Sequence, residues 1–117
     1  MLLDGRAARS CTLAAATLAG ARIETVEGLA RGDALHPVQR AWLDASVPQC
    51  GYRQARQVVA AVALLRETPR PTDADIDAAM AGHLCRCGTQ QKASVGSDSI
   101  REFALPLAQA CATCPAP

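Results

Sequence analysis

The chain has 117 residues, a formal net charge of +1, and an apolar fraction of 50% in which aromatic residues contribute 3%. This length gives room for about one domain. The balanced charge gives no basic surface for nucleic acid, and the abundant alanine favours packed helices over a β-sandwich. No apolar run reaches the length of about 18 residues that is needed to cross a bilayer.

Six cysteines could indicate a disulfide-rich secreted domain, but Cys85 and Cys87 are too close together for an ordinary disulfide framework. A metal or redox role in a reducing compartment is the better interpretation. Residues 11–21 imitate a signal peptide, although Asp4 in the leading segment argues against one. We therefore expect a cytoplasmic location, with the periplasm as the alternative.

The first 33 residues carry only weak strand signals, at residues 11–13 and 23–26, which are too short to form a stable sheet alone. From residue 34 the pattern is helical. Pro37 occupies a first turn, where its missing N–H costs nothing, and Val47-Pro48 ends the helix. Its apolar residues recur at helical spacing and predict one buried stripe: Val38, Ala41, Trp42 and Ala45.

A second helix is predicted over residues 51–67, polar on one side at first and apolar all round from Val58 to Leu65. The third begins at a capping box, Thr72 with Asp75, and Gly82 closes it. Its inward residues are Ile76, Ala79 and Met80. Residues 34–87 are thus expected to form a compact helical unit with cysteines on its interhelical turns.

Cys50, Cys85 and Cys87 can supply soft thiolate ligands. A [2Fe-2S] cluster usually takes four cysteines, and a C-x-x-C pair beginning at Cys50 would place the fourth at position 53. That position holds Arg53, which stays protonated and is a poor metal ligand. On spacing alone, a zinc ion bound by the three cysteines and His83 is as well supported as an iron–sulfur cluster. Buried inert thiols are a third option.

The remaining cysteines carry weaker signals. Cys111 and Cys114 have dithiol spacing but lack a strand–helix context, so incidental cysteines in a loose tail are the favoured interpretation. Cys11 is expected to be a small buried residue.

Several motifs occur in an order that resembles one family: Asp4–Cys11, Gly28-Leu29, His36–Gln39, Gln49–Tyr52, Pro71-Thr72 and Leu84–Thr89. The chain resembles the small iron–sulfur subunit of molybdenum hydroxylases, the group that includes xanthine oxidase, aldehyde oxidoreductase, carbon monoxide dehydrogenase and isoquinoline 1-oxidoreductase. The resemblance covers about residues 2–89, and Q-C-G followed at a distance by C-R-C-G-T is its most specific part.

The resemblance implies a mainly α fold, a [2Fe-2S]-binding helical bundle preceded by a remnant of a β-grasp ferredoxin-like domain. Residues 1–33 would be the end of the plant-type ferredoxin domain, residues 34–89 the bundle, and residues 90–117 a divergent, poorly ordered tail. Only the last ligand of the ferredoxin cluster is matched, by Cys11, so a second cluster is not expected.

The resemblance also implies the site. Cys50, Cys85 and Cys87 match three ligands of the bundle cluster, and Gln49 and Cys87 match positions against the pterin. The molybdopterin would be held by a large partner subunit, and electrons would pass through the cluster toward an external acceptor. The chain would therefore belong to an oxidoreductase complex without being catalytic alone.

Two arginines depart from the family pattern. Arg53 stands at the fourth ligand position, and Arg56 stands where the family commonly has glycine. The sequence also leaves the pattern after Thr89. Two alternatives therefore remain open: a helical remnant without a cluster, and a zinc-stabilised interaction module.

Overall fold

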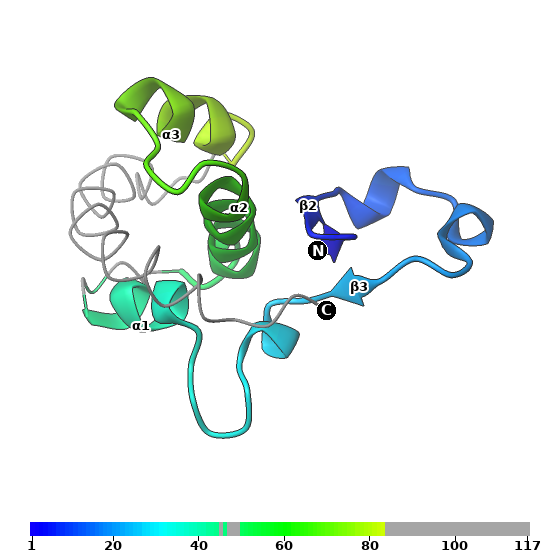
Figure 1. The fold of residues 1–117 in the computed structure, drawn as a ribbon, viewed down its shortest axis with the longest axis horizontal. Helices are drawn as coiled ribbons and strands as arrows, with labels where there is room; N and C mark the ends of the chain where they lie inside the picture. The colour runs from blue at the N-terminus through cyan, green and yellow to red at the C-terminus, as the bar shows by residue number, and fades with distance from the viewer. Residues whose placement is uncertain (45, 47–49, 84–117) are drawn as a thin grey trace.

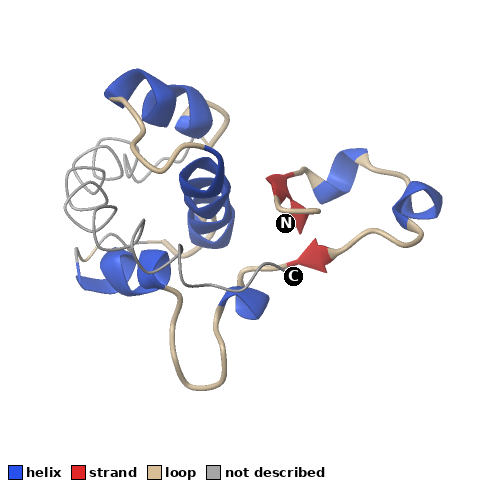
Figure 2. Ribbon diagram, viewed as in Figure 1, coloured by secondary structure: helices blue, strands red, loops and turns tan. Residues whose placement is uncertain are grey.

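The computed structural model describes residues 1–44, 46 and 50–83, and this part of the chain contains three α-helices, three short strands and three short 3-10 helices (Figures 1 and 2). The helices are α1 (Pro37–Asp44), α2 (Gln54–Glu67) and α3 (Asp73–Met80). The strands are β1 (Leu2–Leu3), β2 (Arg6–Ala7) and β3 (Ile23–Glu24). The 3-10 helices span Ser10–Thr12, Ala15–Leu18 and Glu27–Leu29.

The strands form a small antiparallel sheet in the order β2-β1-β3, with Leu2 opposite both Ala7 and Glu24. Asp4 and Gly5 connect β1 to β2, and both have positive φ, +50° and +86°. Asp-Gly with two positive φ values is the preferred two-residue hairpin connection, because its twist matches that of the strands. The predicted strand signal at residues 23–26 is confirmed only over Ile23–Glu24.

The strand signal at residues 11–13 is wrong, because the chain forms a 3-10 turn over Ser10–Thr12. Cys11 in this turn is exposed, so the expectation of a buried cysteine is wrong as well. A short run of β-favouring residues forms a strand only where a neighbouring strand supplies backbone partners. Here the backbone bonds locally instead, with the Thr12 amide donating to the Arg9 carbonyl at 3.1 Å.

Helix α1 begins at Pro37, as predicted, and His36 caps it. The imidazole Nδ1 of His36 accepts a hydrogen bond from the Val38 amide at 3.2 Å, and the His36 amide donates to Gln39 Oε1 at 2.8 Å. The described residues of the predicted apolar stripe, Val38, Ala41 and Trp42, are all buried.

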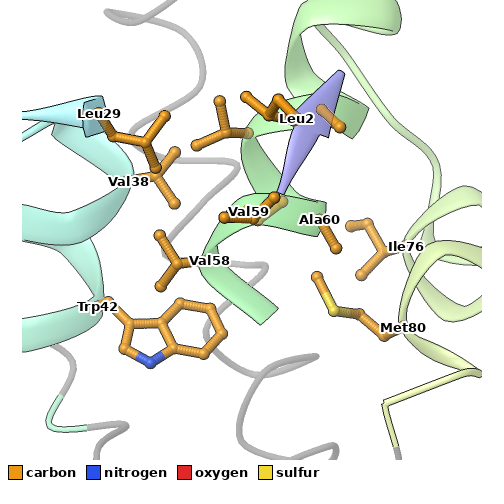
Figure 3. Packing of buried hydrophobic residues seen from close by; sticks show 12 residues of the cluster. Leu2, Leu29, Val38, Trp42, Val58, Val59, Ala60, Ile76 and Met80 are labelled. Atoms are coloured by element: carbon orange, nitrogen blue, oxygen red, sulfur yellow. The ribbon is translucent and has the colours of Figure 1, made fainter. Parts of the chain in front are cut away.

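Helix α2 is the central element, in contact with α1, α3 and strand β2 (Figure 1). Every residue from Gln57 to Ala63 is buried, so the expectation of a buried central helix is confirmed. Figure 3 shows Val58 facing Trp42 of α1, whereas Ala60 faces Ile76 and Met80 of α3. The helix ends at Glu67, two residues before Pro69, which cannot continue it.

Helix α3 begins at the predicted capping box. Thr72 Oγ1 accepts from the Asp75 amide at 3.3 Å, and Asp75 Oδ2 accepts from the Thr72 amide at 2.8 Å. Ile76 and Met80 are buried, and Ala79 is half-buried. The inward face predicted for this helix is therefore confirmed.

The sheet and the helices share one hydrophobic core. Leu2 of β1 is 0% exposed and belongs to the same buried cluster as Val38, Val59 and Ile76 (Figure 3). Arg66 at the end of α2 also pairs with Glu24 of β3, with 2.9 Å between guanidinium and carboxylate. The division of the chain at residue 33 stays a prediction, and residues 90–117 lie outside the described part.

Candidate metal centre

The turn that enters α2 carries Cys50. This cysteine is exposed, and Gly51 after it has φ +77°, a left-handed conformation that glycine adopts without steric cost. Arg53 is the residue at the N-cap of α2. Cys50 therefore lies next to a helix N-terminus, where backbone N–H groups and the helix dipole stabilise negative charge on a thiolate or sulfide.

Arg53 occupies the predicted fourth ligand position and provides no electron pair for a metal. Its guanidinium lies over the ring of Tyr52, 5.8 Å from the ring centroid. Tyr52 is 85% exposed, so this cation–π contact lies at the surface. The structure thus brings Cys50 and position 53 to the same turn, as predicted, with a cation at the second of the two positions.

Gln57 lies one helical turn beyond Arg53, and its backbone N–H donates to the backbone carbonyl of Arg53 at 3.1 Å. We predicted a polar face for this part of α2, but Gln57 is 0% exposed. Within the described part of the chain, neither Oε1 nor Nε2 of its side chain has a hydrogen-bond partner. Sequence reasoning missed this residue, and the only signal for it was a polar side chain four positions after the expected ligand position.

His83 follows α3 and is buried, and its Nδ1 has no hydrogen-bond partner among the described residues. Burial lowers the pKa of this imidazole, and the nearby guanidiniums of Arg56, Arg9 and Arg53 lower it further. The imidazole is therefore neutral at pH 7 and lies in positively charged surroundings. The zinc alternative, which would add three thiolates and a dication next to His83, stays a prediction.

Gln49, Cys85 and Cys87 lie outside the described residues, so their predicted roles stay predictions. Residues 1–44, 46 and 50–83 contain no group of three His, Cys, Asp or Glu side chains that could hold a metal ion. By sequence position, Cys50, Cys85 and Cys87 would supply three of the four thiolates that a [2Fe-2S] cluster usually takes. Among the described residues, Cys50 has the thiol that such a cluster needs, whereas Arg53 has no electron pair for a metal.

Comparison with known proteins identifies the family. Residues 25–95 match the [2Fe-2S] binding domain. The chain belongs to this [2Fe-2S] binding domain family. The match begins before the expected boundary at residue 33 and extends past the expected boundary at residue 89, so it covers the whole predicted bundle.

Two relatives are subunits of an oxidoreductase and of a hydroxylase. The chain is 48% identical to the alpha subunit of isoquinoline 1-oxidoreductase from Brevundimonas diminuta over 93 residues, which are 80% of this chain and 60% of the relative. It is 42% identical to the small subunit of nicotine 6-hydroxylase from Paenarthrobacter nicotinovorans over 87 residues, 74% of this chain and 52% of the relative. The chain thus spans little more than half the length of these relatives.

A solved structure of quinoline 2-oxidoreductase from Pseudomonas putida 86 matches 90% of this chain and 66% of its own, with a TM-score of 0.74 and 33% identity. The predicted resemblance to the small iron–sulfur subunits of molybdenum hydroxylases is therefore confirmed. In the described part of the chain, no helix combines the length and apolar character needed to cross a membrane.

Proposed function

We propose that this chain is an iron–sulfur electron-transfer subunit of a molybdenum-dependent hydroxylase, with Cys50, Cys85 and Cys87 as ligands of one [2Fe-2S] cluster. The observation that carries the proposal is the family match over residues 25–95, which contains these three cysteines. The exposed Cys50 beside the N-terminus of α2 is consistent with it. When bound, such a cluster accepts and passes on electrons at a potential set by its charge and by hydrogen bonds to its sulfurs.

The chain's own residues would position and tune this cluster. The first turn of α2 directs its N–H groups toward the Cys50 turn, which favours the anionic thiolate. Gln57 would donate its buried amide N–H to a sulfur, because an unpaired buried amide is costly. Arg53 adds a positive charge at the ligand position, and we propose that it lowers the occupancy of the cluster.

The partner would be a large subunit that holds molybdopterin, with Gln49 and Cys87 nearest to the pterin. The relatives support this proposal because their names describe them as subunits. The large subunit would bind the substrate, so this chain would not select it. A reading frame for a molybdopterin-binding chain next to this gene, and co-purification of the two products, would test the pairing.

The cluster is tested by anaerobic reconstitution of the full chain with iron and sulfide. We expect visible charge-transfer bands and, after reduction, a paramagnetic signal, with iron well below one cluster per chain. Arg53→Cys restores the fourth thiolate, so we expect its iron content to rise toward about two atoms per chain.

Arg40→Cys is the matched control, because Arg40 is an exposed residue of α1 and the substitution adds the same thiol away from the Cys50 turn. It should leave the iron content unchanged. Equal iron content in the Arg53→Cys variant and the original chain would refute the assignment of position 53 as the missing ligand. A colourless protein that holds one zinc per chain would instead favour the zinc-stabilised module.

A further inference from the structure

A second candidate site lies where residues 7–9, helix α2 and the end of α3 meet. These segments line a cavity of about 190 Å³ that is partly open to solvent. Its charged or polar side chains are Arg9, Arg56 and His83, and the rest of its wall is alanine, glycine, valine and methionine. No carboxylate of the described residues lines it.

The charge balance of the two guanidiniums is the second feature of this cavity. Within the described part of the chain, neither Arg9 nor Arg56 forms an ion pair with a carboxylate. Gly82 allows Arg9 to approach the end of α3, because a Cβ built at Gly82 would lie 2.9 Å from Arg9 Nη2. Both cations line the same cavity as His83.

His83 provides an independent observation at the same place. Its side chain lines the cavity and is buried, with 9% of its surface exposed, and its Nδ1 has no partner among the described residues. A buried nitrogen without a hydrogen bond is costly in a folded protein. The Nδ1 of His83 can carry a proton, and the two guanidiniums are always donors, so the three side chains can together donate hydrogen bonds to an oxyanion.

We propose that this cavity binds a small oxyanion, a free phosphate or the terminal phosphate of a phosphomonoester, between Arg9, Arg56 and His83. The volume of 190 Å³ equals that of about six liquid waters, which suits a phosphate group and is below the size of most organic ligand sites. Arginine favours phosphate because its planar fork can donate two parallel hydrogen bonds. None of its residues is a proposed ligand of the [2Fe-2S] cluster, although His83 lies two positions before Cys85.

The test is calorimetric titration of the full chain with inorganic phosphate at low ionic strength. We expect saturable binding at one site, and a loss of affinity of about tenfold or more in Arg56→Gln and in Arg9→Gln, because each removes a charge-assisted donor. Arg40→Gln is the matched control, since it removes the same charge from an exposed position on α1. Its affinity should stay within about twofold of the original, as expected for a distant, screened charge.

A further variant keeps the site testable if an arginine variant folds poorly. His83→Phe keeps a ring but removes the donor, so it should weaken binding. Glycerol phosphate that binds as tightly as inorganic phosphate would show that the cavity recognises a phosphomonoester end; weaker binding would assign the site to the free ion. Absence of saturable phosphate binding, or an equal loss in Arg40→Gln and Arg56→Gln, would overturn the proposal.

Discussion

At the scale of single residues, Arg53 decides the chemistry of the turn that carries Cys50. The backbone places both residues at the turn that enters α2, with Arg53 at the N-cap. The side chain, however, is a guanidinium that stacks on Tyr52. Because the backbone is suitable and only the donor differs, the effect of position 53 falls on metal binding and not on the fold.

Thr72 provides a residue-scale test of stability. Its hydroxyl is the main cause that lowers the pKa of the Asp75 carboxyl, and its backbone amide is the second cause. Because the folded-state pKa is below the ordinary value of 3.8, the stabilisation is present above that pH and is lost as the pH falls through the folded-state value. We expect Thr72→Ala to lower the free energy of unfolding at pH 7 by about 1 kcal/mol.

Urea unfolding at pH 7 measures the loss of stability in Thr72→Ala, and urea unfolding in acid measures how that stability depends on pH. Thr72→Ala should lose less of its remaining stability in acid than the original chain does, because its Asp75 carboxyl has lost the bond to the hydroxyl. Asp77→Asn is the control, an exposed acid of the same helix away from the cap, with an expected change within about 0.5 kcal/mol. Identical acid dependence in Thr72→Ala and the original chain would contradict the role of the cap.

At the scale of elements, α1 is connected to the first turn of α2 by one side-chain hydrogen bond. Trp42 Nε1 of α1 donates to Gln54 Oε1, the first residue of α2. Gln54 directly follows Arg53, so this bond fixes the helix start that carries the candidate metal centre. Its partner Trp42 is 4% exposed and is the single tryptophan of the chain.

Gln54→Leu should leave the buried indole N–H unpaired, which costs about 1–2 kcal/mol of unfolding free energy. Tryptophan fluorescence during urea unfolding measures the loss, because the signal comes from Trp42 alone. Gln54→Glu keeps an acceptor oxygen and should retain most of the stability. If the leucine and glutamate variants lose the same amount, the hydrogen bond does not stabilise the α1–α2 contact.

At the scale of the whole molecule, strand β1 is part of the helical core, although the sequence suggested a boundary near residue 33. Leu2→Ala should therefore destabilise the entire described unit, by about 3 kcal/mol, as for other fully buried leucines. Circular dichroism of the helices and Trp42 fluorescence should report one common transition. Ile23→Ala is the control, since Ile23 of β3 is 47% exposed. A separate early transition in Leu2→Ala, with helices intact, would show two independent units.

The sequence allowed the helices to be predicted well, because Pro37, the Val58–Leu65 run and the Thr72–Asp75 box are local signals. The β1–β2 hairpin was missed, because its two-residue strands are specified by pairing with β3 and by burial of Leu2, which are contacts between distant positions. For the site, the sequence spacing placed Cys50 and position 53 on one turn, and their roles as ligand positions stay predictions. The burial of Gln57 and His83 and the approach of Arg9 to Gly82 depend on tertiary packing, which no single-sequence pattern contains.

The burial of Leu2 also has a consequence for rates. Its partners in the core lie on helices far along the chain, and such contacts form only after a large loss of chain entropy. The helices are local structures and can form before the strand docks. We therefore expect Leu2→Ala to accelerate unfolding while leaving the folding rate nearly unchanged, as stopped-flow fluorescence of Trp42 would measure. On this view the docked strand acts mainly to prolong the lifetime of the folded core.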